Sequence, residues 1–327
     1  KVKDVLDKIV TDGLIETYQA VNQKLEESIP LGYSNVGIIL EVGCKVKGLK
    51  VGDRVASNGP HAEVFAVNQN LCALVPDNVS NQEAVFTVIA SVGLQGLRLS
   101  KPTYGETFLV SGLGLIGQIT AQLLIANGCQ VLGVDLDERK CSLANSFGVK
   151  TFNITKNENQ VAWCLKNTSD LGIDGAIVTA TSNSSLPINL AAKACRKNGR
   201  IILVGATPIN LSRNIFYEKE INFKVSCSYG PGRYDKSYEV DSIDYPLGYV
   251  RWTEKRNFEA ILSAFAKNSI KTKLLVSHSF QFNEVAEAYK VLLMDKNSLG
   301  IIINYDNHEL NNSKKVFIKN SYIKNEE

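Results

Sequence analysis

The chain has 327 residues, of which 44% are hydrophobic and 21% charged, and its formal net charge is +3. These proportions are typical of a globular protein with a large core and about two domains. So small a charge does not favour nucleic acid or an anionic membrane as a partner. The seven cysteines are scattered without metal-knuckle spacing, which predicts reduced thiols and a cytoplasmic protein.

The first ten residues, KVKDVLDKIV, predict an amphipathic helix. Lys1 is not a native initiator position, because the only methionine is Met294, so we expect the chain to be a fragment or a processed product. A small all-β domain is predicted next, with strands at 34–43, 51–57, 61–67 and 71–76. Ser80 and Glu83 then fit a capping box at the start of a helix.

Strands and helices alternate from Glu106 onward. The strands are expected at 107–112, 129–135, 149–154, 174–180, 199–206 and 222–228, and the helices at 115–127, 138–147, 159–167 and 185–198. Continuous apolar strands separated by amphipathic helices predict an α/β fold with a doubly wound parallel sheet. The uncharged run 107–134 is long enough to span a bilayer, but its glycines favour a buried strand, turn and helix. A further strand, helix and strand are expected within 274–305, before a polar linker from Asp306.

A dinucleotide fingerprint lies between the first strand and the first helix of this alternation. Gly112 permits a tight turn, Gly114 lets the backbone approach a pyrophosphate, and Gly117 lets helix and strand pack closely. Leu115 and Ile116 begin the helix whose N-terminus would hold the phosphates, and they complete the predicted cofactor-binding turn. The alternative is that the glycines only serve a turn.

Asp135 ends the next strand, 18 residues past Gly117, where a ribose-binding carboxylate is expected. A carboxylate accepts hydrogen bonds from both ribose hydroxyls and repels a 2′-phosphate, which predicts NAD as the cofactor. Arg139 and Lys140 lie close by in the sequence, so NADP stays possible.

Four stretches, EVGCKVKGLKVGDRVA, LVPDNVSNQEAVF, VSGLGLIGQ and FNEVAEAYKVL, resemble hallmarks of the medium-chain dehydrogenase/reductase (alcohol dehydrogenase-like) superfamily. The resemblance implies a Rossmann domain and a GroES-like, β-rich catalytic domain. The expected boundaries are 1–104 for the GroES-like domain, truncated at its N-terminus, 105–270 for the Rossmann domain, 271–306 for a return to the catalytic domain and 307–327 for a polar tail.

The same resemblance implies further cofactor contacts. Lys140 matches a lysine that contacts the ribose, and the nicotinamide is expected near the ends of two later strands, at Ala180, Thr181, Gly205 and Ala206.

Zinc-dependent members of the superfamily carry Gly-His-Glu where this chain has Gly32-Tyr33-Ser34. A phenol and a hydroxyl do not replace an imidazole and a carboxylate around zinc. Ala90 or Ser91 stands where a later ligand is expected, and the four-cysteine structural lobe is missing. We therefore expect no zinc and no other metal, with His61 and Tyr33 as the candidates for proton transfer.

A closer resemblance rests on IPLGYSNVG, HAEVFAVNQNL and SCSYGPGRYD…DYPLGYVRWTEKRN. These stretches are similar to the dehydrogenase half of bacterial bi-domain oxidoreductases, in which a glucose–fructose-oxidoreductase-like (Gfo/Idh/MocA) domain follows. The resemblance implies surface polysaccharide synthesis, a sugar or nucleotide-sugar substrate, and a possible fused C-terminal domain in the parent protein.

Residues 228–252 hold five tyrosines and one of the two tryptophans, with neither a strand's alternation nor a helix's stripe. One reading is a packed surface excursion that shields a subunit seam, as in a homodimer. The other is a substrate-facing lid whose aromatic rings stack on a sugar and whose arginines pair with a phosphate or carboxylate. The lid residues would be Tyr229, Arg233, Tyr249, Arg251 and Trp252.

Together these features predict a zinc-independent, NAD-preferring oxidoreductase that transfers a hydride between nicotinamide and a carbonyl or hydroxyl carbon of a sugar-like substrate. Two alternatives stay open. One is an NADPH-dependent quinone or alkene reductase, and the other is a non-catalytic dinucleotide-binding partner domain.

Overall fold

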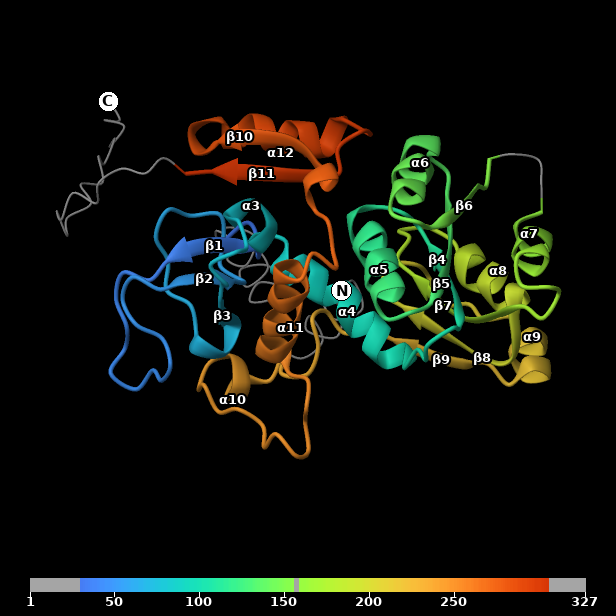
Figure 1. Cartoon of the computed structure of the whole chain (residues 1–327), viewed down its shortest axis with the longest axis horizontal. Helices are drawn as coiled ribbons and strands as arrows, with labels where there is room; N and C mark the ends of the chain where they lie inside the picture. The colour runs from blue at the N-terminus through green and yellow to red at the C-terminus, as the bar shows by residue number, and fades with distance from the viewer. Residues whose placement is uncertain (1–29, 156–158, 306–327) are drawn as a thin grey trace, which may run out of the picture. The chain divides into compact units, whose positions relative to one another are not determined.

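The computed structural model describes residues 30–155 and 159–305 of the chain (Figure 1). These residues divide into two compact units, the first ending at Leu275 and the second beginning at Val276. The expected N-terminal amphipathic helix and the polar tail from Asp306 lie outside the described residues. The predicted domain boundaries stay predictions.

The first unit begins with an antiparallel sheet of three strands. These are β1 (Asn35–Ile38), β2 (Arg54–Ser57) and β3 (Cys72–Leu74), with β2 in the middle. The strand predicted at 61–67 was wrong, because residues 61–64 form a bend and residues 65–67 pair with no described strand. There the His61 N–H donates to the Leu31 carbonyl and the Ala62 N–H to Pro60, so local turns replace a ladder.

The helical connection after β3 follows from its caps. The Ser80 side chain accepts from the Glu83 N–H, and the Glu83 carboxylate accepts from the Ser80 N–H, so the predicted capping box is confirmed at the start of α3 (Asn81–Ala84). Helix α4 (Thr87–Ser100) follows, and its C-cap residue is Lys101, whose backbone is left-handed.

The Rossmann sheet contains six parallel strands in the order β6-β5-β4-β7-β8-β9. The strands are β4 (Thr107–Ser111), β5 (Gln130–Asp135), β6 (Lys150–Asn153), β7 (Ile173–Val178), β8 (Cys195–Leu203) and β9 (Asn222–Val225). The helices between them are α5 (Leu115–Ala126), α6 (Glu138–Ser146), α7 (Gln160–Lys166), α8 (Leu186–Ala194) and α9 (Arg213–Lys219). The doubly wound α/β fold is therefore confirmed.

Both faces of this sheet are covered. Leu109 of β4 packs in a cluster with Cys164 of α7 and Ile188 of α8. Its neighbours Phe108 and Val110 are equally buried and point to the opposite face, because side chains alternate along a strand. The helices flank the sheet in Figure 1. This two-sided burial explains why the strands read as continuous apolar runs.

Helix α8 is shorter than the predicted 185–198. It ends at Ala194, because the Cys195 backbone is extended and pairs with Ile173 at the start of β7. The pairing register then shifts before Gly175, and Asn198 lies within this segment with a φ of 57°. Apolar and polar residues are mixed at the irregular start of β8 in a way that also fits a helix. The sequence pattern therefore predicted a helix that continues to residue 198.

Residues 228–252 contain one described helix, α10 (Lys236–Glu239), and α11 (Glu254–Ala266) follows directly. Helix α11 packs against α4 and β3. The second unit pairs β10 (Val276–Gln281) with β11 (Gly300–Asn304) in parallel, and α12 (Val285–Met294) forms the crossover. The predicted strand–helix–strand order is confirmed.

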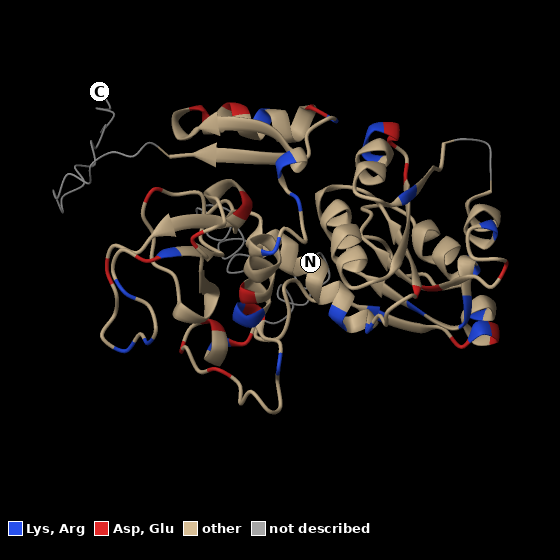
Figure 2. Ribbon diagram, in the orientation of Figure 1, with Lys and Arg blue, Asp and Glu red and all other residues tan. Residues whose placement is uncertain are grey.

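Charge and hydropathy patterns of the described residues agree with burial. Figure 2 shows that basic and acidic residues are interspersed along the ribbon. The uncharged run from Thr107 to Val134 forms β4, α5 and β5, as predicted. Within the described ranges, every helix is too short or too polar to cross a membrane.

Candidate dinucleotide-binding site

The glycine turn after β4 has the geometry that its three glycines predict. Gly112 has a φ of +97°, and its N–H donates to the Val134 carbonyl at 2.9 Å. A Cβ at Gly117 would lie 1.9 Å from the Gly112 carbonyl oxygen, so only glycine permits the helix to pack this close to the strand. A Cβ at Gly114 would meet nothing within 4 Å, so this side of the turn is open.

The open side of the turn is also the N-terminus of α5. Gly114 is the N-cap residue and no side chain caps the helix. The first helical bond of the ladder runs from the Gln118 N–H to the Gly114 carbonyl at 2.8 Å. The N–H groups of Leu115 and Ile116 precede it and belong to the turn whose donors have no partner within the helix. Such a terminus favours a phosphate group.

Asp135 lies beside the turn at the carboxyl end of β5. One carboxylate oxygen accepts from the Leu113 N–H at 2.7 Å, and the other accepts from the Asp137 N–H at 2.9 Å. These bonds fix the carboxylate next to the glycine turn. Each oxygen keeps lone-pair capacity for a further donor, such as a ribose hydroxyl.

The strands on the other side of β4 complete the edge. The Ala180 N–H donates to the Ser111 carbonyl, and a Cβ at Gly205 would lie 2.1 Å from the Ala180 oxygen. Thr181 and Ala206 are exposed just beyond. The carboxyl ends of β5, β4, β7 and β8 thus adjoin, at the switch point where ligands bind in open α/β sheets.

Two polar residues that sequence reasoning missed hold this edge together. The Thr179 hydroxyl donates to the Gly112 carbonyl, and the Gln118 amide donates to the Leu113 carbonyl at 3.1 Å and to the Lys140 carbonyl at 2.8 Å. Gln118 is fully buried. Gln118 directly follows the fingerprint, at a position that the glycine pattern does not specify, so only the fold reveals its role. Lys140 itself is half-buried in α6.

Replacing glycines in the turn is expected to have two different outcomes. Gly114→Ala should leave the melting temperature unchanged but lower NADH affinity by about tenfold or more, because the methyl group occupies open space that a pyrophosphate would approach. Gly117→Ala should also lower the melting temperature, because the added methyl group would collide with the Gly112 carbonyl oxygen. Thermal unfolding and NADH titration of both variants check this. Unchanged NADH affinity in Gly114→Ala would contradict the assigned site.

The structure brings His61 and Tyr33 to neighbouring segments. A Cβ at Gly32 would lie 2.2 Å from His61 Cδ2, so the imidazole packs directly against the residue before Tyr33. Burial lowers the pKa of His61 below 6.5, which makes the neutral imidazole dominant at pH 7. The Tyr33 side chain is 54% exposed.

The donors at the expected zinc positions do not fit zinc. The Ser34 hydroxyl donates to the Val85 carbonyl, while Ala90 and Ser91 are fully buried and the Ser91 hydroxyl bonds the Thr87 carbonyl. Within residues 30–155 and 159–305, no three His, Cys, Asp or Glu side chains lie close enough together to hold a metal ion.

The predicted lid residues separate into two groups. Tyr229 is only 4% exposed, packs on Phe258 and accepts a bond from Asn58, so its ring faces are closed to a sugar. Arg233 forms an ion pair with Glu239 and covers the Tyr229 ring. Neither side chain is free in the way that a lid requires, and the substrate role of both residues stays a prediction.

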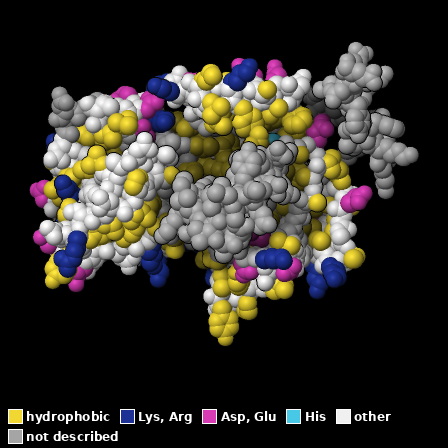
Figure 3. Space-filling model, turned by 180° about the vertical axis from the view of Figure 1, so that it is seen from behind, with side chains coloured by type: hydrophobic (Ala, Val, Ile, Leu, Met, Phe, Trp, Pro, Cys, Tyr) yellow, Lys and Arg dark blue, Asp and Glu magenta, His cyan; other side chains and the backbone are white. Residues whose placement is uncertain are grey.

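In the second group, Tyr249 and Arg251 are exposed and Trp252 is half-buried. Tyr249, in the loop between α10 and α11, is 91% exposed. Hydrophobic side chains project at the lower edge of Figure 3, where this loop lies. Arg251 is exposed and its guanidinium carbon lies 3.8 Å from the centroid of the Trp252 ring. Sequence reasoning missed Arg98, which covers the same ring, because it lies far away in the chain.

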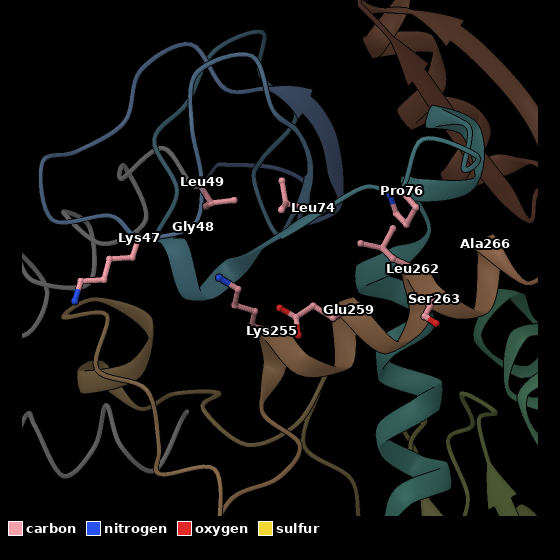
Figure 4. A pocket seen from close by; sticks show the side chains of 10 residues that line it. All are labelled: Lys47, Gly48, Leu49, Leu74, Pro76, Lys255, Glu259, Leu262, Ser263 and Ala266. Carbon is pink, nitrogen blue, oxygen red and sulfur yellow. The ribbon is translucent and has the colours of Figure 1, made fainter.

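A pocket of about 350 Å³ lies elsewhere in the first unit. Figure 4 shows its walls, which come from residues 47–49, from β3 and its end, and from α11. None of the predicted cofactor, catalytic or substrate residues lines it. The chemistry of the glycine turn therefore outweighs the size of this pocket as evidence for a functional site.

Known proteins are similar to this chain over most of its length. Residues 116–241 match a family described as zinc-binding dehydrogenase. An alcohol dehydrogenase of Moraxella sp. (strain TAE123) is 27% identical over 217 residues, which cover 57% of this chain and 63% of the relative. Sorbitol dehydrogenase of Homo sapiens is 24% identical over 315 residues, which cover 85% of this chain and 80% of the relative.

Among solved structures, a short chain alcohol dehydrogenase of Escherichia coli CFT073, complexed with NADH, superposes with a TM-score of 0.68. It is 20% identical and the match covers 84% of this chain and 83% of that one. The chain is thus similar to medium-chain, zinc-type alcohol dehydrogenase-like proteins, and the structural match shows the fold that it shares with one of them. The chain spans less than two thirds of the Moraxella relative's length.

Proposed function

We propose that the chain is an NAD-preferring oxidoreductase that acts on a CH–OH or C=O carbon of a polyol or sugar-like substrate. The observation that carries the proposal is the open glycine turn at the N-terminus of α5 with Asp135 fixed beside it. Relatives named alcohol and sorbitol dehydrogenase, and a structural relative in complex with NADH, support the reaction class and the cofactor.

The residues of the site have distinct roles in this proposal. The N–H groups of Leu115 and Ile116 bind the pyrophosphate, and Asp135 accepts hydrogen bonds from the adenosine ribose. The nicotinamide is expected beside the residues that follow β7 and β8, which are Ala180, Thr181, Gly205 and Ala206. NAD, when bound, supplies the carbon that accepts or donates the hydride.

Proton transfer is assigned to His61 or Tyr33. A neutral imidazole accepts the hydroxyl proton of an alcohol, and the lowered pKa of His61 keeps that form present at pH 7. Tyr33 is accessible and its phenol can donate a hydrogen bond to a carbonyl oxygen.

Substitution at these two residues tests the assignment. His61→Gln or Tyr33→Phe is expected to lower turnover by about a hundredfold or more while NADH affinity stays the same. If His61 is the base, the acid limb of the pH–rate profile for alcohol oxidation lies below pH 6.5, because protonation removes the base. Steady-state kinetics across pH 5–9 with NADH titrations measure both effects. Normal turnover in both variants would exclude these residues.

Zinc independence is part of the proposal, whereas the comparisons favour a zinc-dependent enzyme. The matched family is zinc-binding, whereas Tyr33, Ser34, Ala90 and Ser91 of this chain do not supply zinc donors. Metal analysis of the purified full chain decides between them. Stoichiometric zinc whose removal abolishes turnover would refute zinc independence.

The described residues include no group of side chains that could hold a metal ion. This absence also favours a second candidate function, that of a non-catalytic dinucleotide-binding domain. Label exchange separates the two candidates, because a catalytic chain transfers deuterium between labelled NADH and a polyol or its carbonyl counterpart. The role in polysaccharide synthesis and the fused C-terminal Gfo/Idh/MocA-type domain are further proposals that rest on the resemblance alone.

A further inference from the structure

The pocket beside α11 has the size and the wall of a small-molecule site. Its volume of about 350 Å³ is at the lower end of the range of roughly 300–1,000 Å³ that such sites occupy. This volume suits one small molecule rather than a peptide or a folded partner. Leu49 and Leu74 lie across the pocket from α11 in Figure 4, and Leu262 lines it from α11 itself, so much of the wall is apolar.

Two oppositely charged side chains of α11 also line this pocket. Lys255 and Glu259 lie about one turn apart, so they leave the same face of the helix, and Figure 4 shows them side by side. A lysine and a glutamate at this spacing can form an ion pair, but within the described residues none joins these two. The Lys255 ammonium group instead donates to the Gln69 carbonyl at 3.0 Å. Among the described residues the Glu259 carboxylate has no partner.

The two unpaired charges determine which ligands suit the pocket. The bond to Gln69 holds the Lys255 ammonium group in place, and its other two N–H groups stay available for a ligand. An anion bound to Lys255 would lie near the negative charge of Glu259, and a cation bound to Glu259 would lie near the positive charge of Lys255. A ligand that carries both charges avoids either repulsion and neutralises both side chains.

We propose that this pocket binds a free α-amino acid with an apolar side chain. The α-carboxylate accepts from the Lys255 ammonium group, and the α-ammonium group donates to the Glu259 carboxylate. One carbon joins the two charged groups of an amino acid, so they fit between a lysine and a glutamate that are close but unpaired. The apolar side chain then contacts Leu49, Leu74 and Leu262. The cofactor turn does not line the pocket, so the site goes beyond the proposed function and does not depend on it.

Calorimetric titrations of the full chain at pH 7 with four small molecules test the assignment. L-Leucine has both charges and an apolar side chain, whereas isocaproate lacks its ammonium group, isoamylamine lacks its carboxylate and glycine lacks its side chain. We expect saturable binding of L-leucine, and binding at least about tenfold weaker for each of the other three. Isocaproate or isoamylamine that binds as tightly as L-leucine would contradict a site for both charges. Glycine that binds as tightly would contradict the apolar contacts.

Glu259→Gln separates the contributions of the two charges. It should weaken L-leucine binding about tenfold, because the ligand's ammonium group loses its anionic partner. Isocaproate binding should stay the same or become stronger, because the repulsion between two carboxylates is removed. Glu259 is exposed, so the fold should not suffer. Equal weakening of L-leucine and isocaproate would show that the substitution only disturbs the pocket, and the assignment of Glu259 to the ammonium group would fail.

Two further variants complete the test. Glu218→Gln is the matched control, because Glu218 is also exposed on a helix, α9, but does not line the pocket, and it should bind L-leucine like the unsubstituted chain. Leu74→Ala should weaken L-leucine binding about fivefold and leave glycine binding unchanged, because it shortens the apolar wall. The Leu74 side chain is 49% exposed, so the variant should stay folded. Equal L-leucine affinity in Glu259→Gln and Glu218→Gln, or no saturable binding of L-leucine, would overturn the proposal.

Discussion

Replacing Asp135 with asparagine is expected to weaken NADH binding by about ten- to a hundredfold, while NADPH binding stays the same or improves. The carboxylate accepts from the Leu113 and Asp137 N–H groups and keeps capacity for ribose hydroxyls. A charge-assisted hydrogen bond contributes about 1.5–3 kcal/mol, which corresponds to that range of affinity. Fluorescence titrations with NADH and NADPH give the ratio directly.

A matched control separates cofactor recognition from damage to the turn. Asp137→Asn changes the same charge two residues away, where the carboxylate caps α6 and pairs with Arg139. It should leave the ratio of NADH to NADPH affinity unchanged. If Asp135→Asn lowers the affinities for NADH and NADPH equally, the substitution only disturbs the backbone hydrogen bonds of the turn. The assignment of Asp135 to the ribose would then fail.

Glu254→Gln is expected to make the chain more stable at pH 8.5 and to leave its stability nearly unchanged at pH 5. Glu254 is fully buried in the first turn of α11, and neither carboxylate oxygen has a hydrogen-bond partner. Burial, with the charge of Glu239, raises its pKa from 4.5 to about 8, against the opposing effect of Arg233. A carboxylate in the first turn of a helix is usually favourable, so here desolvation outweighs the helix dipole.

The sign of the pH dependence follows from linkage. Between pH 4.5 and about pH 8 the unfolded chain loses the Glu254 proton while the folded chain keeps it, so stability falls as pH rises. Each pKa unit corresponds to about 1.4 kcal/mol, which sets an upper limit of about 5 kcal/mol for this group. Glutamine resembles the protonated acid and removes that loss.

Thermal unfolding of both proteins at pH 5 and pH 8.5 measures the effect, which should be a gain of roughly 5 °C or more at the higher pH. Glu259→Gln provides the control, because Glu259 is exposed on the same helix. Glu259→Gln should leave the melting temperature unchanged at both pH 5 and pH 8.5. Equal melting temperatures of Glu254→Gln and the unsubstituted chain at pH 8.5 would show that Glu254 is solvated or paired.

The parts of the fold that sequence reasoning predicted are those determined by local patterns. The Gly112–Gly117 turn needs a positive φ at its first glycine and close packing at its last, and only glycine permits either. Apolar strands and amphipathic helices likewise follow from burial on one or two faces. Asp135 could be located because its distance along the chain from the turn is set by one helix and one strand.

The parts that sequence reasoning missed depend on partners far away in the chain. Residues 61–67 alternate like a strand, but a strand requires a partner, and none of the described strands pairs with them. Arg98 reaches Trp252 across more than 150 positions and Glu254 looks like an ordinary first-turn acid until its burial is known. Such contacts have no local signal, because they arise when α11 packs against α4.

Native mass spectrometry of the purified full chain, alone and with NADH, tests the central claim most directly. The account predicts one NADH per chain, retained by the unsubstituted protein and lost in Gly114→Ala, with no zinc in the complex. A chain that binds no NADH would contradict the dinucleotide site itself. A chain that binds NADH together with one zinc ion would keep that site and refute metal-independent chemistry.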